Sequence, residues 1–430
     1  MVCMDLHSRQ EERLMRLTII VTVSAIAIAL TSSAQGAVAD TVQHNGSFVE
    51  KLDNLNRRVI GSLAEGREVT TAGSSRFKVI FLPPPLGNLP DYGFALGVGA
   101  CGLWKTQRDP LLYTSRLPVS VKFGFTNPFS FDARMQPVLY FNRNALKVSA
   151  EVFYRHRNEH YFGIGYDTNR SMERDRGVTG YQSRRFGFTP EVEWRLGRSP
   201  VYVGAVADVG YETMLNAGSY VAQTAEFQAL GGTAAKSTLT DVGAGVDISM
   251  DTRDNMLVPK RGFTLDARLL VYAKALGSDF NYSTFTIDYR HYRRLWGNDN
   301  VLSWGVVSSN AIGNNVPFAR YATVGDRYVM RGYYGYQFRD KSVLKGHVEY
   351  RYMLNIDSPA GKLLLNRFGV AAWGGLALMG RNMVSYNAAL PEIGAGLRLK
   401  VTPRSHLRFD WGYGTATRDV MFYVGVNEMF

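Results

Sequence analysis

The chain has 430 residues, of which 20% are charged, and its formal net charge is +12. Lys and Arg are spread along the chain beside Asp and Glu instead of forming a block, which argues against a nucleic-acid-binding surface. Aromatic residues at 12% and 43 glycines favour many short strands over helices, so the composition indicates an all-β protein.

The N-terminus has the order of segments found in a secretory signal peptide. Three arginines precede the apolar run 17–30, and a stretch of small residues that ends at Ala39 follows it. We therefore predict residues 1–39 as a signal peptide, cleaved after Ala39 or a few residues earlier. Only Cys101 remains after cleavage, so the mature chain cannot form an internal disulfide.

Residues 40–91 form a short segment that we predict to lie in the periplasm. Within it, the stretch 47–63 has the pattern of a helix.

From residue 92 onward, apolar and polar side chains alternate with the period of a strand. The stretch 347–354 sets one apolar face against one polar face: Val348, Tyr350, Tyr352 and Leu354 against His347, Glu349, Arg351 and Met353. Similar alternation occurs in the stretches 191–196, 262–272, 392–401 and 406–414. A soluble sheet with one wet face would also alternate. Export, strands of about 10 residues and the lack of a later long apolar run favour a transmembrane antiparallel β-barrel in the bacterial outer membrane.

The alternating segments number about sixteen, which predicts one barrel over residues 92–430. Tight turns are expected at one end, and long loops at the other, among them 168–180, 214–238, 314–340 and 380–387. The predicted strands are 92–106, 113–124, 130–141, 144–155, 159–167, 181–196, 200–213, 239–251, 262–275, 280–294, 299–313, 341–355, 363–379, 388–403, 405–415 and 419–430.

The stretch 325–341 (GDRYVMRGYYGYQFRDK) combines aromatic and charged residues with no helical or strand period. Folded into a polar lumen, such a loop could bury its rings while Arg331 meets charged or carbonyl partners. An extracellular loop with tyrosines on its surface is the alternative.

Residues 329–340 (VMRGYYGYQFRD), followed by 347–352 (HVEYRY), resemble the signature of the BamA/TamA outer-membrane superfamily, the bacterial surface antigen barrel. The resemblance implies that Arg331, Gly332 and Tyr333 form the tip of a loop folded into the lumen, with Glu349 as the acidic anchor. It also implies a second acidic partner on the next strand, where this chain has Trp373.

Two further stretches resemble the same family. Residues 251–262 are similar to its turn between strands eight and nine, and the matching residues are Asp251, Arg253, Asp254, Pro259 and Gly262. The C-terminal stretch is similar to its terminal strand signal, and the matching residues are Phe422, Val424, Val426 and Phe430. Residues 40–91 are too few for a POTRA module, so the chain resembles a short member that lacks these modules.

The resemblance implies a function in outer-membrane assembly, or in translocation or insertion of polypeptide or lipid. Passage would use a seam between 92–104 and 419–430, because glycines in the first strand weaken its packing; relief of crowding on the wall is the alternative reason for these glycines. A passive, porin-like channel or a structural barrel is the alternative function.

The expected partners are outer-membrane lipid and lipopolysaccharide, a periplasmic partner or client polypeptide, and the barrel assembly machinery that would insert the chain. We expect no catalytic site, cofactor, metal or nucleic acid. The histidines are scattered, and the spacing in 156–160 (HRNEH) falls at an expected tight turn, where the two rings would not converge.

Overall fold

The computed structural model describes the chain from residue 78 onward, with gaps. The described ranges are 78–82, 95–107, 112–125, 129–255, 258–296, 300–325, 329–357, 365–402, 405–426 and residue 428. All of them belong to the compact unit Ile60–Phe430. The expected signal peptide, the helix expected over 47–63 and the terminal Phe430 therefore lie outside the described residues.

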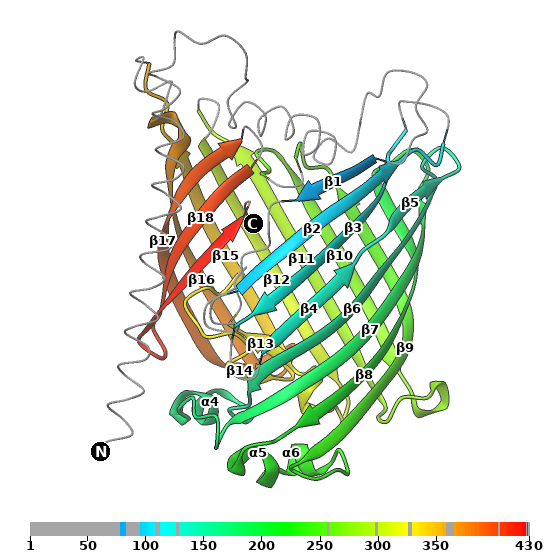
Figure 1. Ribbon diagram of the computed structural model, residues 1–430, viewed down its shortest axis with the longest axis vertical. Coiled ribbons are helices and arrows are strands. Elements are labelled where there is room, and N and C mark those ends of the chain that lie inside the picture. Colours follow the sequence, from blue (N-terminus) through cyan, green and yellow to red (C-terminus); the bar gives the residue numbers. More distant parts are fainter. Residues whose placement is uncertain are drawn as a thin grey trace. The chain divides into compact units, whose positions relative to one another are not determined.

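Antiparallel strands make up most of the described chain (Figure 1). Seventeen strands form one sheet, and because β4 and β5 share one place between β3 and β6, the sheet has sixteen strand positions (17 − 1). This agrees with the predicted number. The first eight are β1 (Lys78–Leu82), β2 (Ala95–Trp104), β3 (Ser115–Gly124), β4 (Ser130–Met135), β5 (Val138–Phe141), β6 (Leu146–His160), β7 (Gly180–Arg195) and β8 (Val201–Leu215). The others are β9 (Lys236–Asp251), β10 (Gly262–Tyr272), β11 (Tyr282–Arg294), β12 (Asn300–Ile312), β15 (Ser342–Met353), β16 (Phe368–Asn382), β17 (Ser385–Thr402), β18 (Ser405–Gly414) and β19 (Asp419–Val426).

The two faces of the sheet differ in polarity as the alternation predicts. Val348 and Ile393 are 50% and 61% exposed on the outer face. Glu349 and Glu392, their neighbours in sequence, are both 1% exposed on the inner face. An apolar outer face and a polar lumen are what a transmembrane β-barrel requires, so the predicted fold class is confirmed.

The predicted strand 159–167 is wrong, because β6 continues without a break to His160. The polar residues 157–160 resemble a turn in sequence, but they extend the strand into the polar lumen. Arg157 Nη2 lies 3.0 Å from Asp132 Oδ2, and the Tyr181 hydroxyl donates to Glu159 Oε2 at 2.8 Å. The expected tight turn at 156–160 is therefore also wrong. Without the strand 159–167, the predicted strands would number fifteen. The sixteenth position is taken by β1, which pairs with β2 and comes from the segment expected to precede the barrel.

Long connections and short helices gather at one end of the sheet, at the bottom of Figure 1. The helices there are α4 (Tyr166–Ser171), α5 (Ser219–Gln223) and α6 (Ala225–Gln228). Single-turn helices are η1 (Lys274–Leu276), η2 (Phe318–Arg320) and η3 (Leu365–Arg367). No helix in the described ranges is long and apolar enough to cross a bilayer. The long loop expected at 380–387 is wrong, because only residues 383–384 separate β16 from β17.

The segment 313–341 joins β12 to β15 and contains the separate pair of strands β13 (Ala322–Val324) and β14 (Phe338–Asp340). We call this segment the lumen loop. It shares an apolar cluster with the inner wall, whose buried members are Ala322, Val324, Val329, Met330, Tyr333, Phe338, Val343, Ala377, Met379 and Leu390. The expected folding of this loop into the lumen is therefore confirmed.

The two ends of the sheet are β1–β2 and β19. Each strand is paired with its neighbour along the whole series, from β1–β2 through β9–β10 to β18–β19. Within the described ranges, no such register joins β19 to β1 or β2. In Figure 1 these edges are the red β19 and the blue to cyan β1–β2 hairpin.

Candidate functional site

Arg331 lies at the tip of the lumen loop and is 1% exposed. Its Nη2 lies 2.5 Å from Glu349 Oε2 on β15, and its Nη1 lies 2.9 Å from Asp410 Oδ2 on β18. Its Cζ stands 3.6 Å from the centroid of a ring of Trp373 on β16, which adds a cation–π contact. The loop tip is therefore bound to three strands of the inner wall.

These contacts keep Arg331 charged although it is buried. Burial alone would lower the pKa of its guanidinium, but Glu349, Asp410 and Glu392 raise the pKa above its ordinary value. A bidentate, stacked arrangement of this kind suits a planar guanidinium and not an ammonium group.

Trp373 stands where the resemblance implies an acidic partner. In this chain the second carboxylate comes from Asp410, two strands further along the sheet. The indole ring provides a face for the guanidinium instead of a charge.

Gly332 brings the backbone of the loop against the backbone of β18. Its N–H donates to the Glu392 carboxylate. A Cβ on Gly332 would lie 2.7 Å from the backbone N of Gly414, and a Cβ on Gly412 would lie 2.5 Å from the Arg331 carbonyl oxygen. Only glycine on both surfaces permits this approach without a shift.

Tyr333 is fully buried, and hydrogen bonds hold both its side-chain hydroxyl and its backbone carbonyl. Its hydroxyl donates to the Pro391 carbonyl on β17, and its own carbonyl accepts a 3.1 Å hydrogen bond from the Tyr423 hydroxyl on β19. The three residues singled out in the sequence, Arg331, Gly332 and Tyr333, thus contact β15, β17, β18 and β19.

Ion pairs continue from Arg331 toward the C-terminus. Asp410 Oδ1 lies 2.6 Å from Arg398 Nη1, and Arg398 Nε lies 3.0 Å from Glu428 Oε2. Arg408 Nη1 lies 2.8 Å from Asp410 Oδ2. We call the following residues the buried charge network: Arg331, Glu349, Arg351, Glu392, Arg398, Arg408, Asp410 and Glu428. The network connects the loop tip to a residue just beyond β19.

The turn 252–261 is organised by the residues that the resemblance singles out. Arg253 Nη2 lies 2.7 Å from Asp251 Oδ2, and Asp254 Oδ1 accepts hydrogen bonds from the backbone N–H groups of residues 260 and 261. Gly262 has φ 94°, and a Cβ there would lie 2.2 Å from the Thr252 carbonyl oxygen. The Pro259 carbonyl accepts a 2.9 Å hydrogen bond from Arg351 Nη2, so the turn touches the buried charge network.

The terminal strand has its apolar residues on the outer face. Phe422 lies beside Trp411 of β18 with ring centroids 5.1 Å apart, and Val424 is half-buried on the same face. The backbone of Val426 ends the strand. Beyond the strand, Glu428 is buried against Arg398 and His406.

A second arginine of the lumen loop, Arg320, was not singled out by the sequence. Its Nη1 lies 2.7 Å from Glu212 Oε2 on β8, and its Nη2 lies 2.7 Å from Asp241 Oδ2 on β9. The hydroxyl groups of Tyr282 and Ser183 donate to the same two carboxylates. No local pattern marks Arg320, because its partners are distant in sequence.

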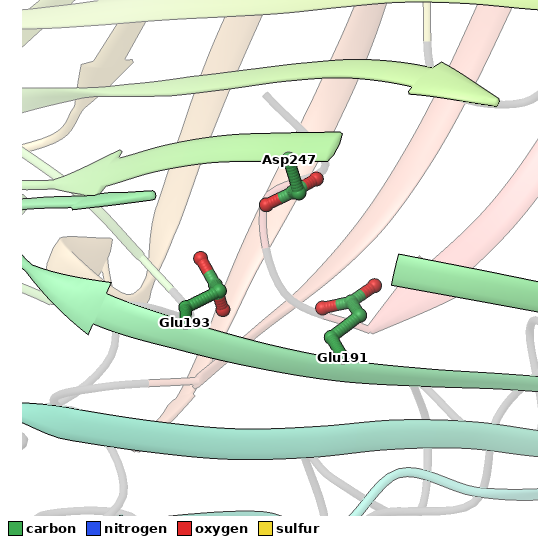
Figure 2. Close-up of side chains that lie close together, drawn as sticks. All are labelled: Glu191, Glu193 and Asp247. Atoms are coloured by element: carbon green, nitrogen blue, oxygen red, sulfur yellow. The ribbon is translucent and has the colours of Figure 1, made fainter. Parts of the chain in front are cut away.

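Three inner-face carboxylates, Glu191 and Glu193 of β7 and Asp247 of β9, point toward one another (Figure 2). Each offers an oxygen, and these oxygens lie within 4.8 Å of one another. Arg268 contacts both Glu191 and Asp247, and Lys147 Nζ lies 2.6 Å from Glu193 Oε2. Since each of the three carboxylates pairs with Arg268 or Lys147 of the chain itself, we interpret the trio as a set of ion pairs in the wall.

A family model described as the Omp85 superfamily domain matches residues 112–430. No curated protein sequence matches the chain significantly.

Among solved structures, BamA from Haemophilus ducreyi lacking POTRA domains 1–3 is similar, with a TM-score of 0.58 and 11% identity over 82% of this chain and 70% of that chain. CdiB from Acinetobacter baumannii is similar, with a TM-score of 0.51 and 11% identity over 83% of this chain and 60% of that one. CdiB from Escherichia coli has a TM-score of 0.50 and 10% identity over 84% of this chain and 68% of that chain. At such identities the structures support the fold alone.

Proposed function

Since the chain belongs to the Omp85 superfamily, we propose that it passes polypeptide or lipid through a seam between β1–β2 and β19. It is a β-barrel of the bacterial outer membrane, of the class involved in insertion or translocation. No POTRA module is present among the described residues.

The observation that supports the seam is the uneven pairing around the sheet. β6 and β7 pair over fifteen residues, whereas the outermost pairings on the two sides of the seam are shorter: β18 and β19 pair over eight, and β1 and β2 over five. The free edge of β19 has no register with β1 or β2 in the described part of the chain. Unpaired backbone groups are costly in lipid, so this is where the sheet separates most easily.

The lumen loop argues against a passive diffusion channel, which is the alternative function. Its apolar cluster and its two arginine anchors place it across the inner wall from β8 and β9 to β15 and β18. Solutes would therefore meet packed side chains in the lumen. Under this proposal the chain carries out no catalytic step.

The proposed partners follow from a seam open to the membrane. They are a client polypeptide or lipopolysaccharide, together with a periplasmic protein that would deliver the client. The barrel assembly machinery would insert the chain itself.

A cysteine cross-link tests the seam. Cysteine pairs placed along Ala95–Trp104 and Asp419–Val426, in a Cys101→Ser background, should cross-link and block function until a reductant is added. The readout is the level of outer-membrane and exported proteins in the cells. The control pair replaces Tyr413 and Val420, which face each other in the β18–β19 hairpin, and its cross-link should leave function intact. A seam cross-link that forms fully without loss of function would refute the proposal.

Conductance in planar bilayers separates the two functions. The gated barrel should show small, irregular openings that the seam cross-link suppresses. Large, steady, ion-selective pores that persist in the cross-linked protein would favour the porin-like alternative.

A further inference from the structure

A cavity of about 250 Å³ lies between the lumen loop and the inner wall formed by β6, β7 and β8. Arg155 and Arg157 of β6 and Arg185 of β7 line it from the wall. Arg320, Arg339 and Tyr336 line it from the loop. We call this space the arginine cavity. It is separate from the contacts of Arg331 and from the seam.

The charges around the arginine cavity are predominantly positive. Five guanidiniums line it, but only two carboxylates do so, those of Glu159 and Glu212. Arg155 and Arg185 are direct partners in the β6–β7 register, so two like charges face the lumen side by side. Like charges directly opposite each other in a sheet are destabilising unless something compensates them.

Carboxylates of the chain compensate four of the five arginines. Asp132 lies 3.3 Å from Arg155 and 3.0 Å from Arg157. Glu212 pairs with Arg320, and Glu159 lies 3.9 Å from Arg339.

Arg185 is the exception. Within the described ranges it makes no hydrogen bond or ion pair; its Cζ lies 5.6 Å from the centroid of the Phe153 ring, and its charge acts on the Glu212 carboxylate without pairing with it.

Donor groups at the arginine cavity are also unsatisfied. The Nε atoms of Arg185 and Arg339 are buried and make no hydrogen bond with the described residues, whereas Arg155 Nε lies 3.3 Å from Asp132 Oδ2. A buried donor without an acceptor costs free energy. The arginines line the cavity from both the wall and the loop, and guanidiniums on several sides suit a ligand with acceptor oxygens on several sides, as a phosphate group has and a carboxylate does not.

We propose that the arginine cavity binds a small phosphate-bearing anion, with Arg185 as its principal contact. The volume accommodates a phosphate or diphosphate group and is close to the ~300 Å³ at which ligand pockets begin. A bound anion would join the loop arginines to the wall arginines. A phosphate free in solution and one in a lipid headgroup would be recognised by the same chemistry.

Calorimetric titration of the full chain in detergent with sodium phosphate tests this proposal, with chloride adjusted to hold the ionic strength constant. Saturable binding is expected. Arg185→Gln should weaken it about tenfold or more, because a charge-assisted hydrogen bond is lost. Arg185→Lys should keep most of the affinity. Since Arg185 makes no hydrogen bond or ion pair with the described residues, folding should survive both changes, as heat-modifiable migration would show.

Arg184→Gln is the matched control, because Arg184 neighbours Arg185 on β7 but is exposed on the outer face. It should bind phosphate like the unaltered protein. Absence of binding by the unaltered protein, or equal binding by folded Arg185→Gln, would overturn the proposal.

Reconstitution into phosphatidylcholine vesicles with and without lipid A identifies the source of the phosphate. Loss of phosphate binding only in vesicles with lipid A assigns the arginine cavity to a lipid headgroup. Binding that persists in both assigns it to a free anion.

Discussion

The lumen loop is held at two places, by Arg320 on β8 and β9 and by Arg331 on β15 and β18. Both arginines lie between two carboxylates, but their surroundings differ. The carboxylates around Arg320 also accept hydrogen bonds from Ser183 and Tyr282. The carboxylates around Arg331 are shared with other arginines of the buried charge network.

This difference indicates different roles for the two anchors. Arg320 forms a local attachment whose partners keep other hydrogen bonds if it is lost. Arg331 belongs to a network that extends to Glu428 beyond the terminal strand, so its loss should disturb the edge of the sheet as well as the loop. Three substitutions sharpen this comparison.

Arg331→Ala should have the largest effect. Breaking a buried ion pair on one side costs about 3–5 kcal/mol, and this change breaks two pairs and a cation–π contact. We expect lower heat-modifiability and a lower urea midpoint in lipid vesicles. Arg331→Lys should recover only part of the loss, because an ammonium group cannot reach both carboxylates and stack. Unchanged migration after heating would mean that the loop does not depend on this anchor.

Arg320→Ala should destabilise the protein by about 2–3 kcal/mol, since Glu212 and Asp241 each keep one hydroxyl donor. The same urea titration measures the effect. The two anchors share no ion-pair partner in the described chain, so the double variant should show additive losses. A strongly non-additive result would show that the anchors act as one unit.

Gly332→Ala should cost about 1–3 kcal/mol, because the new Cβ would overlap the backbone of β18 at 2.7 Å. Gly346→Ala on β15 is the matched control, since a Cβ there meets nothing within 4 Å. Urea unfolding of the two variants side by side isolates the close approach. Equal stability of the Gly332→Ala and Gly346→Ala variants would contradict the close approach of the loop backbone to β18.

Much of the fold was predictable, because lipid contact forces an apolar side chain at every second position of a strand. The continuation of β6 through residues 157–160 was missed, since a polar strand that lines a lumen has the composition of a turn. The contribution of β1 was missed because five residues are too few to show a period.

The two arginine anchors also differ in whether they could be recognised from the sequence. Arg331 was identified because it belongs to a local motif, Arg331 to Tyr333, that resembles a family signature; the close backbone approach at Gly332 explains why glycine stands beside it. Arg320 gave no such sign, since side chains alone make its contacts. The partner of Arg331 on β18 was not foreseen either, because Asp410 is remote in sequence and becomes a neighbour only through the strand order.

The buried charge network is electrically balanced, with four guanidiniums (Arg331, Arg351, Arg398, Arg408) against four carboxylates (Glu349, Glu392, Asp410, Glu428). A substitution that removes one member leaves a whole charge stranded away from water. Over evolutionary time these positions can therefore drift only in matched exchanges. Related barrels that have lost the acid at position 428 should have lost an arginine facing it as well.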